Sequence, residues 1–291
     1  MKHTRVLSWM MVAAACMAAA GQDAHVLRRE LKEGASDVYK VESKVDQTVQ
    51  LSQLGMGDQK MLITSGMKLA INTGKVDKEK QTADLEMVSS DFTFDMEGMA
   101  GMAGAPTPEM PKEMKVLGTI DSQNRITGMK PVGAAAGMMG ASMNASSGTM
   151  FISFPDHAVK VGDSWDVKIP KNPAMGNADT VLKATLKGEA MDGSIPVWLV
   201  SMEGTLLLDM DMAEMMKDNP QAQGALAMGN MKITGKIDLQ AEAQMEKGNG
   251  RTRKMVVQMK GNQKMDMADM GMTLEMQTAG TTSLSLVEDK H

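Results

Sequence analysis

The feature that most constrains the fold of this chain is a period-two alternation of apolar and polar residues, which recurs in long runs. In the first run the apolar residues share one parity, and Lys40, Glu42 and Lys44 stand between them. These apolar positions are Tyr39, Val41, Val45, Val49 and Leu51. Because successive side chains of a strand point to opposite faces, the pattern predicts a strand with one buried face.

The same alternation predicts strands in both halves of the chain, separated by short polar turns that are typical of antiparallel meanders. In the first half the expected strands cover residues 61–71, 83–87, 92–96, 116–120 and 125–129. In the second half they cover residues 165–169, 181–186, 195–202, 231–245, 255–259, 265–276 and 283–287. The apolar parity changes across Ser89 and Ser90, which predicts a β-bulge at that point.

Two segments rich in small residues and methionine, 98–112 and 133–148, interrupt the strands and are expected to be loops or linkers. A boundary near residue 148 then separates an N-terminal β domain, 22–148, from a C-terminal β domain, 149–291. We therefore expect a mainly β fold in which antiparallel meanders form two curved, half-barrel-like sheets. At most one short helix is expected, over residues 212–217, with Asp211 as its N-cap.

The first 21 residues have the order of a signal peptide. Lys2 and Arg5 give a basic start, residues 6–15 form an apolar run, and small residues follow as far as Gly21. A permanent transmembrane helix needs about 20 apolar residues, and neither this run nor any later one reaches that length. The sequence therefore predicts an exported protein whose mature chain has no transmembrane helix.

Two cleavage patterns overlap in this segment. Ala18, Ala19 and Ala20 satisfy the small-residue rule of an ordinary signal peptidase, which would release a periplasmic or secreted protein. Cys16, preceded by three alanines, is similar to a lipobox, in which the cysteine is lipidated and tethers the protein to a membrane. Because Cys16 is the only cysteine, the mature fold has no internal disulfide, thiolate metal site or cysteine nucleophile.

Charge and the scarcity of histidine exclude several function classes. Without the signal segment 29 basic and 36 acidic residues remain, a formal charge of −7 that argues against nucleic acid as a partner. A catalytic triad needs a histidine, and the mature chain offers only His25, His157 and His291. Neither a nucleophile-elbow motif nor a phosphate-binding glycine motif occurs. We expect a protein that is not an enzyme and uses no cofactor.

Methionine is unusually frequent, with 35 residues beside an aromatic content of only 3%. In the predicted strands methionines occupy the parity of Ile, Leu and Val, and we interpret them as flexible core-filling residues. Those strand residues are Met61, Met67, Met87, Met231, Met245, Met255 and Met259. The methionines of the expected loops have no core to fill, and they stand at positions 99, 102, 110, 114, 138, 139 and 143.

Clustered methionines also suggest a soft-metal site, since thioether sulfur prefers Cu(I) or Ag(I). The first candidate set is Met210, Met212, Met215 and Met216, and the second is Met265, Met267, Met270 and Met272. A third set, in an expected loop, is Met96, Met99 and Met102. In a strand, two methionines separated by one residue lie on the same face, so such a pair could share an ion.

One motif resembles a known family. Phe154 and Pro155, followed by the run from Val159 to Trp165 that contains Gly162 and Asp163, are similar to a segment of uncharacterised exported bacterial proteins, many of them lipoproteins. Tyr39-Lys40-Val41 and the stretch from Asp121 to Ile126 add to this resemblance. The family has no known function, so the resemblance implies no catalytic residues. Physically, Pro155 is expected to end a strand, Gly162 and Asp163 to turn the chain, and Trp165 to plug the core.

Three functions stay open from the sequence. A concave sheet lined by methionine and aliphatic side chains, as in periplasmic lipoprotein carriers of the half-barrel type, would suit a lipid or another hydrophobic ligand or partner. Alternatively, the methionine clusters would bind Cu(I) or Ag(I). The third alternative is a purely structural surface protein.

Overall fold

The computed structural model describes residues 23–51, 57–98, 112–132, 151–169, 179–211 and 231–290. The strands of the first half are β1 (Ser36–Gln50), β2 (Gln59–Asp77), β3 (Thr82–Glu97), β4 (Glu113–Asp121) and β5 (Ile126–Val132). Those of the second half are β6 (Ser164–Ile169), β7 (Thr180–Asp192), β8 (Ile195–Asp211), β9 (Met231–Glu246), β10 (Thr252–Met267) and β11 (Met272–Lys290). In these ranges the only helical element is a 3₁₀ turn, η5 (Ala268–Met270), so the mainly β prediction is confirmed.

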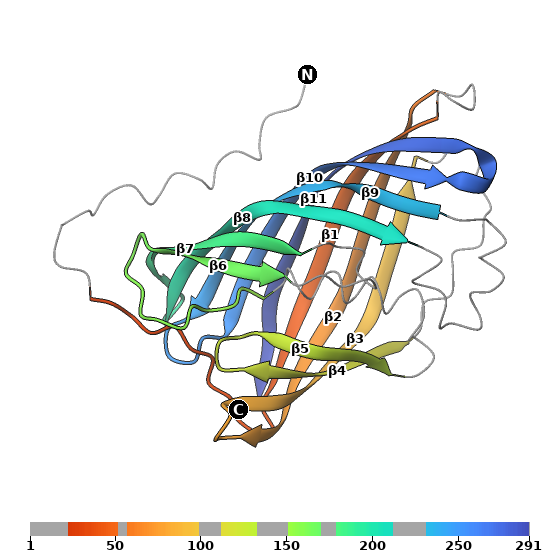
Figure 1. The fold of residues 1–291 in the computed structure, drawn as a ribbon. Coiled ribbons are helices and arrows are strands. Elements are labelled where there is room, and N and C mark those ends of the chain that lie inside the picture. Colours follow the sequence, from red (N-terminus) through yellow and green to blue (C-terminus); the bar gives the residue numbers. More distant parts are fainter. Residues whose placement is uncertain are drawn as a thin grey trace.

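All eleven strands belong to one open antiparallel sheet, with the order β5-β4-β3-β2-β1-β11-β10-β9-β8-β7-β6. The expectation of two sheets is not met, because β1 pairs with β11 from Ser36 opposite Lys290 to Gln50 opposite Glu275. This ladder joins the first and second meanders into a single surface (Figure 1). Both segments assigned to separate domains therefore contribute strands to the same sheet, and the boundary near residue 148 lies outside the described residues.

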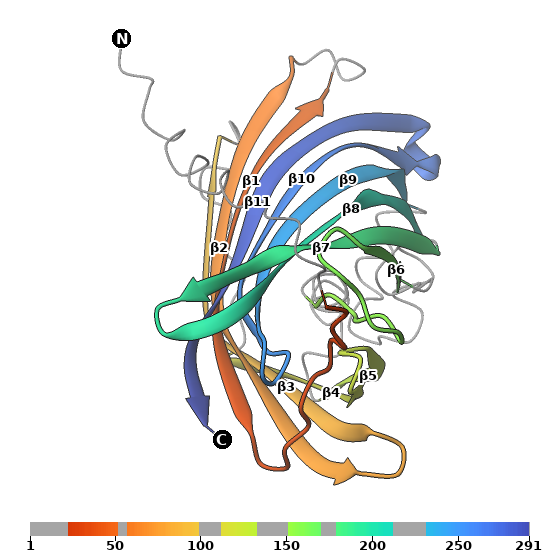
Figure 2. The ribbon, with the colours of Figure 1, turned by 90° about the vertical axis from the view of Figure 1, so that its left-hand side faces the viewer.

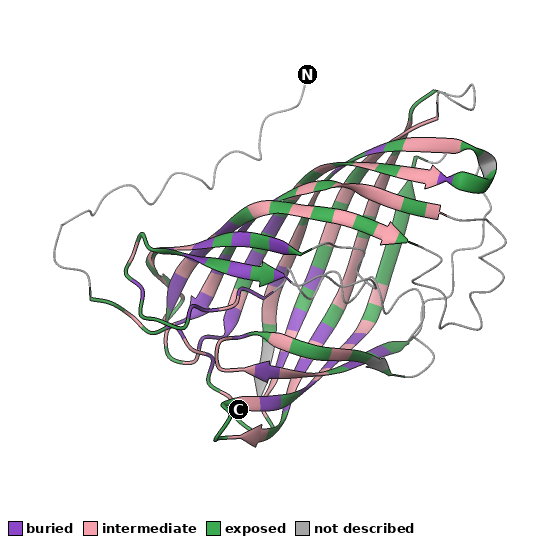
Figure 3. Cartoon of the chain, in the orientation of Figure 1, coloured by how far each residue is buried: buried purple, intermediate pink, exposed green. Residues whose placement is uncertain are grey.

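The sheet is strongly curved and has an inner and an outer face. Figures 1 and 2 show that the curvature brings the edge strands β5 and β6 to the same side of the molecule. The inner face carries the parity that the sequence predicted for burial, from Tyr39 and Val41 in β1 to Met255 and Val257 in β10. Burial is uneven along the strands, since buried residues gather at one end of the sheet, which we call the basal end (Figure 3).

Of three local predictions, one is confirmed by the structure. The parity change in β3 is confirmed: the β2–β3 register shifts between Gly66 and Lys68, and Asp91 has a φ of 52°. The expected strand 265–276 is interrupted, since β10 ends at Met267 and β11 starts at Met272 after η5. The predicted helix 212–217 lies outside the described residues.

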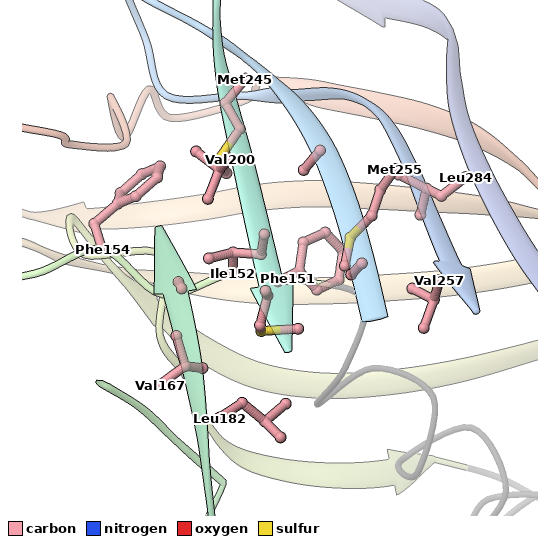
Figure 4. Packing of buried hydrophobic residues seen from close by; sticks show 14 of the residues in the cluster. Phe151, Ile152, Phe154, Val167, Leu182, Val200, Met245, Met255, Val257 and Leu284 are labelled. Carbon is pink, nitrogen blue, oxygen red and sulfur yellow. The ribbon is translucent and has the colours of Figure 1, made fainter. Parts of the chain in front are cut away.

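Two segments without regular structure cover the inner face at the basal end. They are residues 23–35 and residues 151–161, and the latter we call the strap segment. Phe151, Ile152 and Phe154 of the strap segment are at most 6% exposed and pack among side chains of the sheet (Figure 4). Leu27 of the first segment is 2% exposed and belongs to the same cluster. The core of the molecule is therefore the space between the basal half of the sheet and these two segments.

Hydrogen bonds connect the strap segment to both edges of the sheet. The Phe154 amide donates to the carbonyl of Gln123, in the β4–β5 turn, over 2.7 Å, and Asn124 Nδ2 donates to the Ile152 carbonyl over 3.1 Å. On the other side, Trp165 Nε1 of β6 donates to the Ser153 carbonyl over 2.7 Å. The strap segment thus bridges the two edges of the open sheet at the basal end.

Candidate functional site

Beyond the basal end the inner face continues as an apolar surface that we call the distal trough. Cross-strand register places its residues in consecutive rows across β2, β1, β11, β10, β9 and β8. Its apolar residues are Met61, Ile63, Val45, Val49, Met272, Leu274, Met276, Met259, Met265, Met267, Met231, Ile233, Ile237, Leu206, Leu208 and Met210. All are half-buried except Met267 and Met276, which are 8% and 5% exposed.

The polar side chains of the trough find partners within the same face. Gln47 Nε2 donates to Met276 Sδ over 3.4 Å, and Gln263 Nε2 donates to Thr278 Oγ1 over 3.4 Å. An apolar lining with a few polar groups is the usual composition of a small-molecule site. The trough therefore has the chemistry of a surface for an apolar ligand.

Glycines allow neighbouring backbones to approach closely at three inner-face positions. A Cβ on Gly261 would lie 2.3 Å from the Lys236 carbonyl oxygen, and one on Gly235 would lie 2.4 Å from that of Asn262. A Cβ on Gly280 would lie 2.9 Å from the Lys44 carbonyl oxygen. At these positions the floor of the trough is backbone, which leaves room between the larger side chains of adjacent rows.

The predicted methionine sets are only partly within the described residues. Met212, Met215 and Met216 of the first set, and Met99 and Met102 of the loop set, lie outside them. Met210 is half-buried on the inner face of β8, and Met96 is 40% exposed on β3. Met114, which we expected in a loop, is instead in β4 and 4% exposed, since it faces the same interior as Val116.

The second methionine set converges at the distal end of β10 and β11. Met265 and Met267 lie on the inner face of β10, Met272 opens β11, and Met270 belongs to η5. Met267 is directly opposite Met272 on one side and Met231 of β9 on the other. Sequence reasoning missed Met231 as a neighbour, because alternation assigns a residue to a face and not to a partner strand.

The described residues contain neither a cluster of ionisable metal ligands nor a membrane-spanning helix. There, no three His, Cys, Asp or Glu residues are placed to hold a metal ion together. Over the same residues, no helix has the length and apolar character needed to cross a bilayer.

The residues of the family-like motif lie at the junction of the strap segment with β6. Phe154 and Trp165 are each 6% exposed, and the carbonyl of buried Pro155 accepts a hydrogen bond from Arg28 Nη1 over 2.8 Å. Gly162 has a φ of 96°, a conformation that favours glycine. Asp163 Oδ2 accepts from the Lys160 amide over 2.8 Å, which closes the turn before β6. The motif therefore positions the strap segment against the sheet.

A buried ionic network, also at the basal end, was not expected from the sequence. Asp37 of β1 accepts hydrogen bonds from Arg29 Nη2 over 2.7 Å and from Arg251 Nη1 over 3.3 Å. All three side chains are at most 7% exposed. The parity of Asp37 is a signal that could have shown this, since it shares the inner face with Tyr39 and Val41 and so needs a buried partner.

The network continues from Arg251 to β7, β9 and β10. Glu246 accepts from Arg251 Nη2 over 2.7 Å and from Arg253 Nη1 over 2.9 Å. Asp192 accepts from Arg253 Nε over 2.6 Å and from Lys254 Nζ over 2.7 Å. The chain of contacts joins residues 23–35 and β1 to β7, β9 and β10 through the β9–β10 turn.

Burial and pairing shift the pKa values in this network. Hydrogen bonds from Lys254 and Arg253 lower the pKa of Asp192. Burial acts to raise the pKa of Glu246, but the hydrogen bonds from Arg251 and Arg253 outweigh it and the pKa is lowered. Burial raises the pKa of the neighbouring Tyr39 hydroxyl, which stays neutral. Asp192 and Glu246 are therefore held ionised, and their ion pairs stabilise the fold.

The histidines do not form a catalytic constellation in the described part of the chain. His157 Nδ1 lies 3.0 Å from Asp156 Oδ1, and both side chains are mostly exposed. His25 forms a β-bridge with Val159, and its ring centroid lies 4.5 Å from that of Trp198. Its contacts place it in the packing of the basal end.

No protein-family model and no curated protein matches this chain. Among solved structures the chain is similar to lipovitellin, in a structure that describes lipid–protein interactions of that protein. The match has a TM-score of 0.48 and 10% identity, and it covers 90% of this chain and 26% of the lipovitellin chain. A likeness of this size assigns neither ligand nor activity.

Proposed function

We propose that this chain is a non-enzymatic exported protein that binds an apolar ligand, one acyl chain of a lipid, along the distal trough. The observation that carries the proposal is the half-burial of apolar side chains in successive rows on strands whose basal portions are buried. An apolar surface of this extent gains free energy when water is replaced by hydrocarbon, at about 25 cal/mol per Å². A ligand would thus bury the inner face at the distal end, as the strap segment buries it at the basal end.

The length of the trough fits this class of ligand. From Met259 to Met267 it extends along β10, which at about 3.4 Å per residue is about 27 Å. One leaflet of a bilayer's hydrocarbon core is about 15 Å thick, half of the whole core. An acyl chain of a membrane lipid can therefore lie extended along the strands within the trough.

The lining suits a ligand without a fixed shape. Methionine has three rotatable bonds and a polarizable sulfur, so it adapts to irregular apolar surfaces. Methionines occur in every strand of the trough except β1. Such a surface selects for apolar character and length more than for a particular head group.

Export remains part of the proposal and rests on residues 1–21 of the sequence. Mass analysis of the mature N-terminus separates the two routes: a lipidated Cys16 means a membrane-tethered protein, and a start near Gly21 means a periplasmic or secreted one. An intact Met1 on protein from its own host would contradict export.

The binding proposal is tested by native mass spectrometry of protein purified from its own host, followed by titration of the delipidated chain with a fluorescent fatty acid. We expect co-purified lipid and saturable binding. Met265→Glu, which places a charge in the trough, should weaken binding at least tenfold, because ionised groups are expensive to bury.

The matched control is Asn262→Glu, which places the same charge on the exposed outer face of β10. It should bind as the unaltered chain does, and circular dichroism of both variants should match. A lipid-free mass together with no fatty-acid binding would overturn the proposal and favour a purely structural surface protein. Equal binding by both variants would place the ligand outside the trough.

A further inference from the structure

We propose that Met231, Met267 and Met272 form a binding site for Cu(I) or Ag(I) at the distal end of the trough. The three residues come from β9, β10 and β11, and the register places Met267 directly between the other two. This site lies beyond the lipid-binding proposal and does not depend on it.

The geometry allows three sulfurs to meet. Side chains directly opposite each other on adjacent antiparallel strands have Cβ atoms about 4.5–5.5 Å apart. All three methionines are on the inner face, so their side chains extend from the same side of the sheet. Since each methionine has three rotatable bonds, the two outer thioethers can lean toward the central one without moving the backbone.

The burial of the three residues fits a site that is enclosed on one side and open on the other. Met267 is 8% exposed, whereas Met231 and Met272 are half-buried. An ion could therefore reach the central sulfur from the trough and then be shielded from water by the two flanking side chains.

The donor set determines the class of metal. Three neutral thioethers are soft ligands, which favour Cu(I) and Ag(I) and bind Zn²⁺, Ca²⁺ or Mg²⁺ poorly. In the described residues no group of His, Cys, Asp or Glu offers a competing site. The preference for Cu(I) and Ag(I) over harder cations would then come from the thioether sulfurs alone.

The charged residues next to this site lie on the outer face of the sheet. Asp209 and Asp211 of β8 and Asp266 of β10 surround Lys232, the residue after Met231. The hydrogen bond with Asp209, at 2.9 Å, and the charges of the other two carboxylates raise the pKa of Lys232. Lys232 follows Met231 in β9 and therefore points to the opposite face, which leaves the inner-face site to neutral thioethers.

The experiment is a titration of the full chain with Ag(I) in chloride-free buffer, followed by NMR of ¹³C-labelled methionine methyl groups. Single Met→Leu substitutions assign the three resonances. We expect these three methyls to shift together and to saturate at the first equivalent. X-ray absorption of that complex should show sulfur ligands alone.

Affinity is then measured by competition with a soft-metal chelator, for Ag(I) and for Cu(I) without oxygen. The triple variant M231L/M267L/M272L should lose at least tenfold in affinity. The control M61L/M210L/M259L removes as many methionines from three separate rows of the trough and should stay within twofold. Leucine conserves volume, and equal melting temperatures would show that both variants fold.

Two results would overturn the proposal. One is equal affinity of the two triple variants, and the other is a first equivalent that shifts methyls other than these three. The wild-type NMR titration gives the second answer even if a triple variant does not fold.

Discussion

The two ends of the inner face are built from the same strands and the same kinds of residue, yet the described segments cover only the basal end. Met255 and Met265 both lie on the inner face of β10, but Met255 is 2% exposed and Met265 is half-buried. The difference comes from the strap segment and residues 23–35, which pack on the basal end. A curved sheet alone therefore does not bury its concave face, and the segments that pack on it decide whether a strand position is buried or half-buried.

The ends also differ in their polar interactions. The basal end contains charges at Arg29, Asp37, Arg251 and Glu246 that are nearly inaccessible to water. The trough holds neutral amides and hydroxyls such as Gln47 and Thr278, paired over longer distances. We infer that the basal end contributes most of the stability of the fold and that substitutions at the distal end cost less stability.

The largest effect on stability is expected for Asp37→Ala. It leaves Arg29 and Arg251 buried with one acceptor fewer, and breaking a buried ion pair from one side costs about 3–5 kcal/mol. Urea denaturation measures it, with Asp46→Ala on the exposed face of β1 as control, for which we expect a change within about 0.5 kcal/mol. Similar urea midpoints for the two variants would show that the ionic network does not stabilise the basal end.

A smaller effect is expected for Met255→Ala, compared with Met265→Ala on the same strand. Truncation of a buried methionine costs about 2–5 kcal/mol through lost transfer energy and a cavity. The half-buried Met265 has less to lose, and we expect about 1 kcal/mol. Equal losses in thermal unfolding would mean that the two ends are equally packed.

Acid should weaken the basal end. Since the pKa values of Asp192 and Glu246 are lowered in the folded state, their contribution is present above the unfolded values near about 4. It is lost as the pH falls through the folded values, because the unfolded chain then binds more protons. Urea denaturation from acid to neutral pH measures this loss. The free energy of unfolding of the D192N/E246Q variant should fall less steeply with acid than that of the unaltered chain, and an equal slope would contradict this.

The smallest expected effect is the oxidation of single methionines in the folded protein. Brief peroxide treatment should oxidise Met265, Met272 and Met96 before Met245 and Met255, because sulfoxide formation follows exposure. Peptide mass spectrometry gives the order, and added fatty acid should protect Met265 and leave the oxidation of Met191, 63% exposed beside the β7–β8 turn, unchanged. Early oxidation of Met255 in folded protein would show that the basal end opens readily.

Most strands could be predicted because alternation is a local signal. The inner-face parity of β1 and β10 and the bulge near Asp91 follow from residues that are close in the sequence. The pairing of β1 with β11 could not be predicted in this way, since both strands read equally well as the edge of a separate sheet.

The candidate sites show the same limit. Met265, Met267 and Met272 could be selected from their spacing, but their neighbour Met231 comes from another strand. The ionic network depends on Arg251 reaching Asp37 across the fold, and charged residues near turns are ordinarily solvated. Only the inner parity of Asp37 was visible in advance.

The β1–β11 ladder has a consequence for how the chain reaches its fold. Every other ladder joins strands that follow each other in the sequence and can form as a hairpin, whereas this one must bring together strands from opposite ends of the described chain. Contacts of such long sequence separation form slowly. Until they form, β1 and β11 are unpaired edges that invite aggregation. If a chain with this topology crossed a membrane unfolded, the β1–β11 ladder could not form until β11 had crossed.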